Sequence, residues 1–202
     1  MQTVTLGTTG ITVNKNGFGA LPIQRITTEN AVHLIKKAYE AGITFFDTAR
    51  FYTDSECKLG EALEGIRDKV YIATKTGATT ADAFWKDLET SLGNLRTDYV
   101  DLYQFHNPSF CPKPGDGSGL YEAILEAKAQ GKVRHIGITN HRLSVAEEAI
   151  ESGLYETLQF PFCYLSGERE EIGTGSAFDI PFSKFSESLP DSFEGDDPGR
   201  LI

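Results

Sequence analysis

The stretch VYIATKTGATTADAFWKDLETSLGNLRTDYVDLYQFH, Val70 to His106, holds two apolar runs on either side of one longer segment. The runs, residues 70–76 and 99–106, show little polar alternation, which is typical of strands covered on both faces. Residues 80–95 between them are predicted to form a helix. The stretch therefore predicts a strand, a crossover helix and a second strand parallel to the first.

The same alternation continues on both sides of this stretch, after a short N-terminal segment that we predict to be a hairpin across residues 3–6 and 11–14. The predicted strands are 15–23, 43–49, 70–76, 99–106, 133–140 and 156–162, and the predicted helices are 27–42, 55–66, 80–95, 119–132 and 142–153. Six strands separated by five helices predict an α/β protein with a parallel sheet and right-handed crossovers. A doubly wound sheet and a (β/α)₈ barrel both satisfy this pattern, and periodicity alone does not choose between them.

Composition limits the classes of function. The chain has 202 residues, 40% hydrophobic and 24% charged, which fits a globular protein. Its net charge of −10 argues against nonspecific nucleic-acid binding, which needs Lys and Arg to replace counterions. No apolar run is long enough for a transmembrane helix, and the N-terminus lacks the pattern of a secretory signal.

The cysteines and histidines predict neither a metal site nor a disulfide framework. Cys57, Cys111 and Cys163 are far apart, odd in number and without CxxC spacing, so we interpret them as reduced thiols in a cytoplasmic protein. The four histidines show no HxxxH or HExxH pattern. The chain also lacks GxGxxG and GxxxxGK[ST] motifs in a suitable context, which leaves a phosphate-handling barrel without support.

Four polar residues follow or end predicted strands. Asp47 ends the second strand, Tyr52 lies in the loop after it, Lys75 ends the third strand and His106 ends the fourth. Each alone is more typical of a cap, a turn or a solvated side chain. Because the carboxyl ends of parallel strands point to one side, where active sites form, the four together predict a catalytic site.

These residues carry a resemblance to a known family. The segments FFDTARFYTDSE, YIATKTG, DYVDLYQFHNP, GKVRHIGITNH and LQFPFCYL resemble the aldo-keto reductase superfamily, in its bacterial branch, and they occur in the family's order. The resemblance covers residues 5 to 165. It implies a (β/α)₈ TIM-barrel fold, NADPH (or NADH) as cofactor, and reduction of small aldehydes or ketones to alcohols.

The resemblance also implies roles for the four polar residues. Tyr52 matches the proton donor, and Lys75 matches a lysine whose ammonium would lower the pKa of the phenol. Asp47 would pair with Lys75 and hold it in place, and His106 would orient the substrate carbonyl. Hydride would come from the nicotinamide and the proton from Tyr52.

Three further residues match cofactor-binding positions of the family. Thr139 and Asn140 match a Ser-Asn pair after the fifth strand, and Gln159 matches a glutamine on the sixth. The resemblance implies that their hydroxyl and amide groups grip the nicotinamide carboxamide. Without the motif context, ordinary hydrogen bonding at strand ends would explain Asn140 and Gln159.

The barrel predicted here is incomplete or divergent after about residue 166, because six βα units are present instead of eight. We therefore predict a barrel portion over residues 1–166. Residues 167–202, rich in Ser, Gly, Pro and acids, are predicted to be an irregular, disordered tail, in which Phe178, Phe182, Phe185 and Phe193 could contact a surface.

The alternative function is a non-catalytic binding or interaction module that lacks the cofactor half. Open sheet edges also predict self-association.

Overall fold

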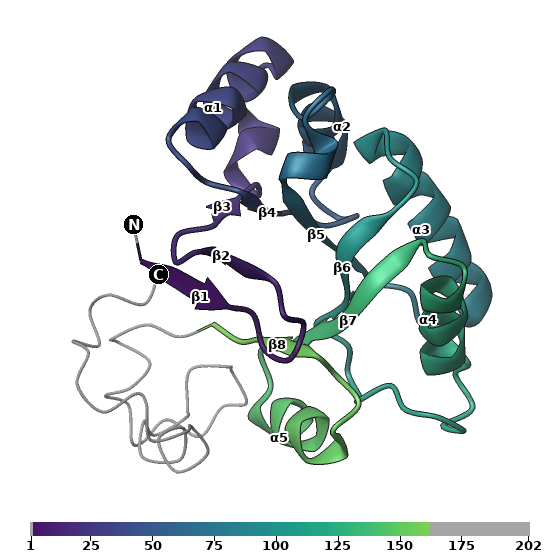
Figure 1. Ribbon diagram of the computed structural model, residues 1–202. Coiled ribbons are helices and arrows are strands. Elements are labelled where there is room, and N and C mark those ends of the chain that lie inside the picture. The colour runs from purple at the N-terminus through teal and green to yellow at the C-terminus, as the bar shows by residue number, and fades with distance from the viewer. Residues whose placement is uncertain (1, 162–202) are drawn as a thin grey trace, which may run out of the picture.

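A computed structural model describes residues 2–161 of the chain, and its centre is a curled sheet of six parallel strands (Figure 1). The strands are β3 (Phe18–Gly19), β4 (Phe45–Asp47), β5 (Tyr71–Thr76), β6 (Val100–His106), β7 (Val133–Thr139) and β8 (Thr157–Gln159). They lie side by side in sequence order. A doubly wound sheet reverses its strand order at a switch point, so this order decides in favour of part of a barrel.

The helices cover the convex side of the sheet, as Figure 1 shows. They are α1 (Thr28–Glu40), α2 (Ser55–Ala62), α3 (Ala81–Leu95), α4 (Leu120–Ala129) and α5 (Leu143–Ser152), with two short 3₁₀ turns, η1 (Pro22–Arg25) and η2 (Arg67–Lys69). The predicted six strands and five helices are confirmed. The first predicted strand is shorter than expected because η1 begins at Pro22, whose ring fixes φ and removes a hydrogen-bond donor.

Local sequence accounts for the helices. Threonine side chains cap two of them: Thr27 accepts a hydrogen bond from the backbone N–H of Asn30, and Thr80 accepts one from that of Ala83. The inner face of α3 then buries Phe84 and Leu88 against the sheet. Because β5 and β6 are buried almost throughout, the core lies between the strands and the helical layer.

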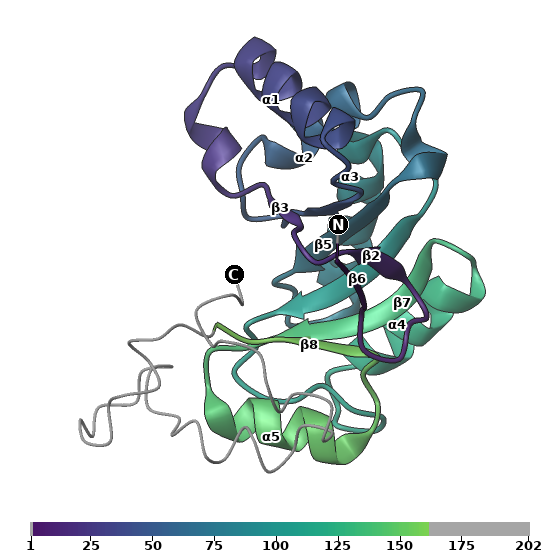
Figure 2. The same cartoon turned by 60° about the vertical axis from the view of Figure 1, so that its left-hand side comes forward.

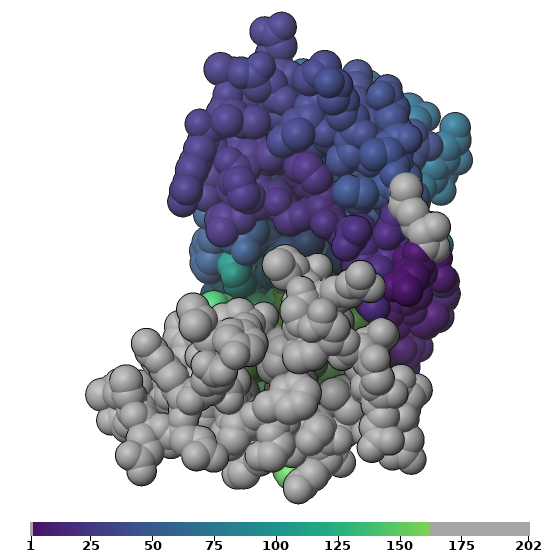
Figure 3. Space-filling view, turned by 90° about the vertical axis from the view of Figure 1, so that its left-hand side faces the viewer, coloured from purple at the N-terminus to yellow at the C-terminus, as the bar shows by residue number. Residues whose placement is uncertain are grey.

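The N-terminal hairpin, β1 (Thr3–Thr5) and β2 (Thr12–Asn14), lies on the concave side of the sheet (Figure 2). Its turn touches the chain just before β8: the N–H of Thr8 donates to the carbonyl of Glu156 at 3.0 Å. Gly7 has φ +48°, and a Cβ there would lie 1.9 Å from the Glu156 oxygen. Glycine is therefore required at this contact. In Figure 3 the hairpin, in dark purple, lies beneath the block formed by the N-terminal helices.

The amino ends of the strands are held by a buried acid. Asp101, 1% exposed, accepts hydrogen bonds from Arg67 at 2.7 Å, from Arg134 at 3.0 Å and from the N–H of Ile72 at 2.9 Å. Both guanidinium groups also stack on the ring of Tyr99, at 4.1 and 3.7 Å from its centroid. Every oxygen of this carboxylate is satisfied, which suits a structural role at this end.

The sheet has two edges within residues 2–161. There β3 pairs only with β4, and β8 pairs only with β7. The predicted boundary at residue 166, the 167–202 tail and its four phenylalanines lie outside the described residues. The domain division therefore stays a prediction.

Two helical glycines supply a matched test of packing. A Cβ on Gly60 in α2 would lie 2.3 Å from the backbone oxygen of Asn94 in α3, whereas a Cβ on Gly93 meets nothing within 4 Å. We expect Gly60→Ala to lower the free energy of unfolding by about 1–3 kcal/mol through overpacking. Gly93→Ala should raise it by about 0.5–1 kcal/mol through helix propensity. Urea unfolding measures both, and equal effects would contradict the close approach of α2 and α3.

Candidate active site

The carboxyl ends of five adjacent strands bring the predicted site residues together. Asp47, His106, Thr139 and Gln159 are the last residues of β4, β6, β7 and β8, and Lys75 is the next to last of β5. The parallel register pairs His106 with Thr139, and Thr139 with Gln159. Residues far apart in sequence thus line one rim of the sheet.

Asp47 and Lys75 form a buried ion pair at this rim. The side chain of Lys75 is 2% exposed, and its Nζ lies 2.5 Å from Asp47 Oδ1. The same Nζ donates to the carbonyl of Thr48 at 2.7 Å. Burial raises the pKa of Asp47 and lowers that of Lys75, and the attraction between the two charges opposes both shifts. The short contact is typical of a charge-assisted hydrogen bond.

Tyr52 lies beside this pair, in the loop between β4 and α2. Lys75 Nζ is 5.4 Å from the centroid of the Tyr52 ring, and the ring meets that of His106 edge-on at 5.7 Å. Burial, and then the charge of Asp47, raise the pKa of the phenol. The direction that the resemblance implies for this pKa is therefore wrong for this structure, in which burial and the carboxylate of Asp47 both disfavour the phenolate. The phenol therefore keeps its proton at neutral pH.

His106 is neutral and has an unused nitrogen. Its ring also stacks on Phe51 at 5.8 Å, and its Nδ1 is buried with no hydrogen-bond partner among residues 2–161. Burial, followed by the positive charges of Lys75 and His141, lowers its pKa to about 4. The residue also lines a cavity, so a ligand would meet its ring from that side.

A cavity of about 260 Å³ adjoins His106, between the loops that follow β5 and β6. Phe51 forms one wall with 65% of its surface exposed, and Phe105 and Phe110 form others. The Phe51 ring lies so close over Gly77 that a Cβ there would be 2.0 Å from it. Sequence reasoning missed Phe51 and Gly77. Phe51 directly precedes Tyr52, and Gly77 lies two residues after Lys75.

A second cavity of about 330 Å³ lies on the concave side of the sheet, next to Asp47. Gln104 and Gln159 both line it, and Gln104 Nε2 donates to Gln159 Oε1 at 3.4 Å. Both amides help to lower the pKa of Asp47 against the effect of burial. Sequence reasoning missed Gln104, whose signal was its position two residues before His106 on the same strand.

The remaining predicted cofactor residues shape loops in this structure. Thr139 Oγ1 accepts a hydrogen bond from the N–H of Asn107 at 3.2 Å. Asn140 is fully buried; its Nδ2 donates to the carbonyl of Pro108 at 2.8 Å, and its Oδ1 accepts from the N–H of Arg142 at 2.7 Å. Of the three, Gln159 is the exposed one and faces the concave cavity. A ligand amide therefore fits Gln159 more readily than Thr139 or Asn140, whose side chains are buried and already bonded.

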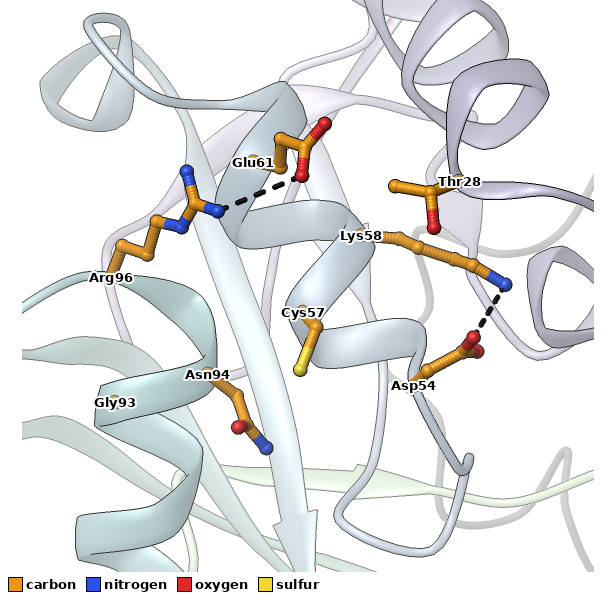
Figure 4. Close-up of a pocket in the computed structure, with 8 residues that line it drawn as sticks. All are labelled: Thr28, Asp54, Cys57, Lys58, Glu61, Gly93, Asn94 and Arg96. Carbon is orange, nitrogen blue, oxygen red and sulfur yellow. Dashed lines mark ion pairs between the residues drawn. The ribbon is translucent and has the colours of Figure 1, made fainter.

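Another cleft, of about 240 Å³, lies among the helices (Figure 4). Its charged residues are paired with one another: Lys58 with Asp54 at 2.8 Å, and Arg96 with Glu61 at 3.6 Å. The exposed Cys57 points into it. This cleft lies away from the strand ends, and its charges balance, so it offers nothing to the chemistry at the rim.

Within residues 2–161 no group of three or more His, Cys, Asp or Glu side chains could hold a metal ion. Nor does any helix in that range have the length and apolarity to cross a membrane. Cys57 and Cys111 are free thiols, whereas Cys163 lies outside the described residues.

Comparison with known proteins gives the family. A model of the "Aldo/keto reductase family" matches residues 4–171 of this chain. The chain belongs to the aldo/keto reductase family. This finding confirms the resemblance inferred from the sequence, and it fits the partial barrel and its rim.

Three known proteins illustrate how similar the chain is to its relatives and how much of each it covers. The chain is 38% identical over 148 residues to methylglyoxal reductase DkgB of Salmonella typhi, covering 69% of this chain and 52% of that protein. It is 34% identical over 155 residues to L-galactose dehydrogenase of Arabidopsis thaliana, covering 69% and 49%. An aldo/keto reductase from Klebsiella pneumoniae, solved with NADP and acetate, is 25% identical with a TM-score of 0.68, covering 79% and 58%. The chain thus spans about half the length of the curated relatives it matches.

The neutral state of His106 predicts a pH dependence of stability. In the folded chain its pKa is about 4, against an ordinary value of 6.5. Between these values the unfolded chain takes up a proton that the folded chain does not, so this contribution to stability is complete above pH 6.5 and is lost as the pH falls towards 4. We expect the Tm of the wild type to fall more steeply over this range than that of His106→Gln. His33→Gln, at an exposed position of α1, should follow the wild type.

Thermal unfolding followed by circular dichroism at half-unit pH steps measures this difference. Parallel Tm curves for the wild type and His106→Gln would contradict the burial of a neutral imidazole at the rim.

Proposed function

We propose that this aldo/keto reductase chain carries the proton-transfer half of an NADPH-dependent reduction of small aldehydes or ketones to alcohols. The observation that carries the proposal is the buried Asp47–Lys75 ion pair, with Tyr52 and His106 in contact around it at one rim. An acid, an amine, a phenol and an imidazole so arranged can protonate a carbonyl oxygen as it gains charge.

The proton comes from Tyr52, whose raised pKa keeps the phenol protonated in the resting state. As a carbonyl oxygen becomes an alkoxide, it takes the Tyr52 proton and leaves a phenolate, which solvent then reprotonates. Lys75, whose Nζ lies 5.4 Å from the centre of the Tyr52 ring, would oppose the negative charge of that phenolate against the unfavourable effects of burial and of Asp47, and Asp47 holds the lysine in position. NADPH, when bound, supplies the hydride to the carbonyl carbon, so that one hydride and one proton convert the carbonyl to an alcohol.

His106 would orient the substrate. A neutral imidazole can donate one hydrogen bond and accept another. His106 and Phe51 line the same cavity, so the ring could meet the carbonyl oxygen of a substrate whose apolar part lies against Phe51. The ring thereby keeps the carbonyl near the phenol of Tyr52.

Thr139, Asn140 and Gln159 would hold the nicotinamide. Support comes from the exposed amide of Gln159 beside Asp47 and from the NADP in the Klebsiella pneumoniae relative. Asn140 would act by fixing the loop, because its amide is already bonded. NADH is the alternative cofactor. A cytoplasmic location is part of the proposal, supported by the free thiols of Cys57 and Cys111.

A non-catalytic binding module is the second candidate. It is favoured by the hydrogen bonds that Thr139 and Asn140, two of the expected cofactor residues, already make within the chain. The two candidates differ in whether this chain binds NADPH and turns it over, so a single pair of measurements separates them.

The first measurement is turnover. We expect NADPH oxidation in the presence of a small aldehyde, and a roughly 10²- to 10⁴-fold loss of kcat in Tyr52→Phe, because the phenolic proton is gone. Tyr71→Phe, at the opposite end of β5, should keep wild-type turnover. If Tyr52→Phe were as active as the wild type, Tyr52 would not be the proton donor.

The second measurement is binding. Titration of NADPH with the chain, followed by nicotinamide fluorescence, should give saturable binding that Tyr52→Phe retains. Binding without turnover would favour the module, and no binding at all would exclude this cofactor for the chain.

We also propose self-association through the open edges of the sheet, since β3 and β8 each present unpaired backbone groups within the described range. Size-exclusion chromatography at two concentrations tenfold apart should show a shift to earlier elution. The Tm should rise with concentration, as it does for any associating protein. A monomer with a sharp, concentration-independent transition would contradict this proposal.

A further inference from the structure

Glu56 is a buried acid outside the catalytic group. It lies in the first turn of α2, four residues after Tyr52, and its side chain is 0% exposed. Acidic side chains are almost never fully buried unless they are paired. Removing a carboxylate from water is costly, so its partners must be specific and complete.

Three segments of the chain supply those partners. Arg50, in the loop before Tyr52, forms an ion pair with Glu56 Oε2. Thr74, in β5, donates to Glu56 Oε1 at 2.8 Å, and Asn94, at the end of α3, donates to Oε2 at 3.1 Å. Figure 4 shows Asn94 on the side of α3 that faces α2. One carboxylate therefore joins a loop, a strand and a neighbouring helix.

Two of these partners are next to catalytic residues. Thr74 directly precedes Lys75 in β5. Arg50 lies two residues before Tyr52, and its backbone N–H donates to the carbonyl of Lys75 at 3.0 Å. A change at Glu56 therefore reaches Tyr52 along the loop and Lys75 along the strand.

We propose that Glu56 is a positioning residue, whose carboxylate sets the place of the Tyr52 loop relative to Lys75. This inference rests on the proposed function and deepens it. An apolar side chain of equal size would fill the same space, but it could not hold three donors in fixed directions. The charge and the two oxygens of Glu56 are therefore what hold its three partners in fixed positions.

The test replaces Glu56 by Gln, which keeps the shape, removes the charge and leaves Arg50 without its ion pair. The matched control is Glu61→Gln on the same helix, at an exposed site paired with Arg96. Both variants and the wild type are prepared with 3-fluorotyrosine, and the ¹⁹F signal of Tyr52 is assigned by its loss in Tyr52→Phe. Circular dichroism verifies that each variant is folded.

In Glu56→Gln we expect the Tyr52 signal to shift or broaden. Its titration midpoint should fall towards the ordinary value for a tyrosine, because a loosened ring meets more water. Where the wild type turns over NADPH, kcat should fall by about 10²-fold with little change in KM, as expected for a proton donor displaced by an ångström. Glu61→Gln should match the wild type in every readout.

An unchanged ¹⁹F signal and titration midpoint in a folded Glu56→Gln protein would overturn the proposal, even if its Tm were lower. Should Glu56→Gln fail to fold, Thr74→Val removes only one donor and should shift the same signal in the same direction. Absence of turnover in the wild type would contradict the proposed function alone, since the ¹⁹F readout does not depend on activity.

Discussion

The rim of this molecule depends on one ion pair. Lys75 is buried on β5, and its ammonium bonds to Asp47, at the end of the neighbouring β4, and to the carbonyl of Thr48. The parallel register of the two strands fixes that spacing, because it pairs Asp47 with Ala73, two residues before Lys75 and on the same face of β5. Tyr52 lies beside the ammonium of Lys75 and packs against His106, and strand pairing fixes the position of that lysine. The geometry of the candidate site is thus a consequence of strand pairing.

Buried polar groups lie at both ends of the strands, and they differ in how completely they are hydrogen-bonded. At the amino ends, Asp101 satisfies both of its oxygens with Arg67, Arg134 and a backbone N–H, which leaves nothing for a ligand. At the carboxyl ends, His106 keeps a nitrogen without a partner in the described range. Thr157 Oγ1, at the amino end of β8, also lacks a partner in that range, so the complete pairing of Asp101 is a property of that carboxylate and not of all polar groups at its end of the sheet.

Sequence reasoning predicted the elements and the rim because both depend on local pattern. Strand-end positions followed from the βα alternation, and the choice between a doubly wound sheet and a barrel came from the family resemblance and from the strand order in the structure. The pKa of Tyr52 was predicted in the wrong direction, since a sequence does not show how far the phenol is buried or how close it lies to the carboxylate of Asp47. Gln104 and Glu56 were missed because burial and partners decide their roles, and neither is visible in a linear pattern.

The hairpin contact has a consequence for how the chain folds. Each βα unit can form from residues close in sequence, yet Gly7 and Thr8 meet Glu156, whose side chain also binds Lys128 and His135. Bringing these ends together closes a loop of nearly the whole described chain, at an entropic cost that grows with the logarithm of its length. We therefore expect the hairpin to dock only after β8 has paired with β7, which would make its contact with Glu156 a probe of late folding events.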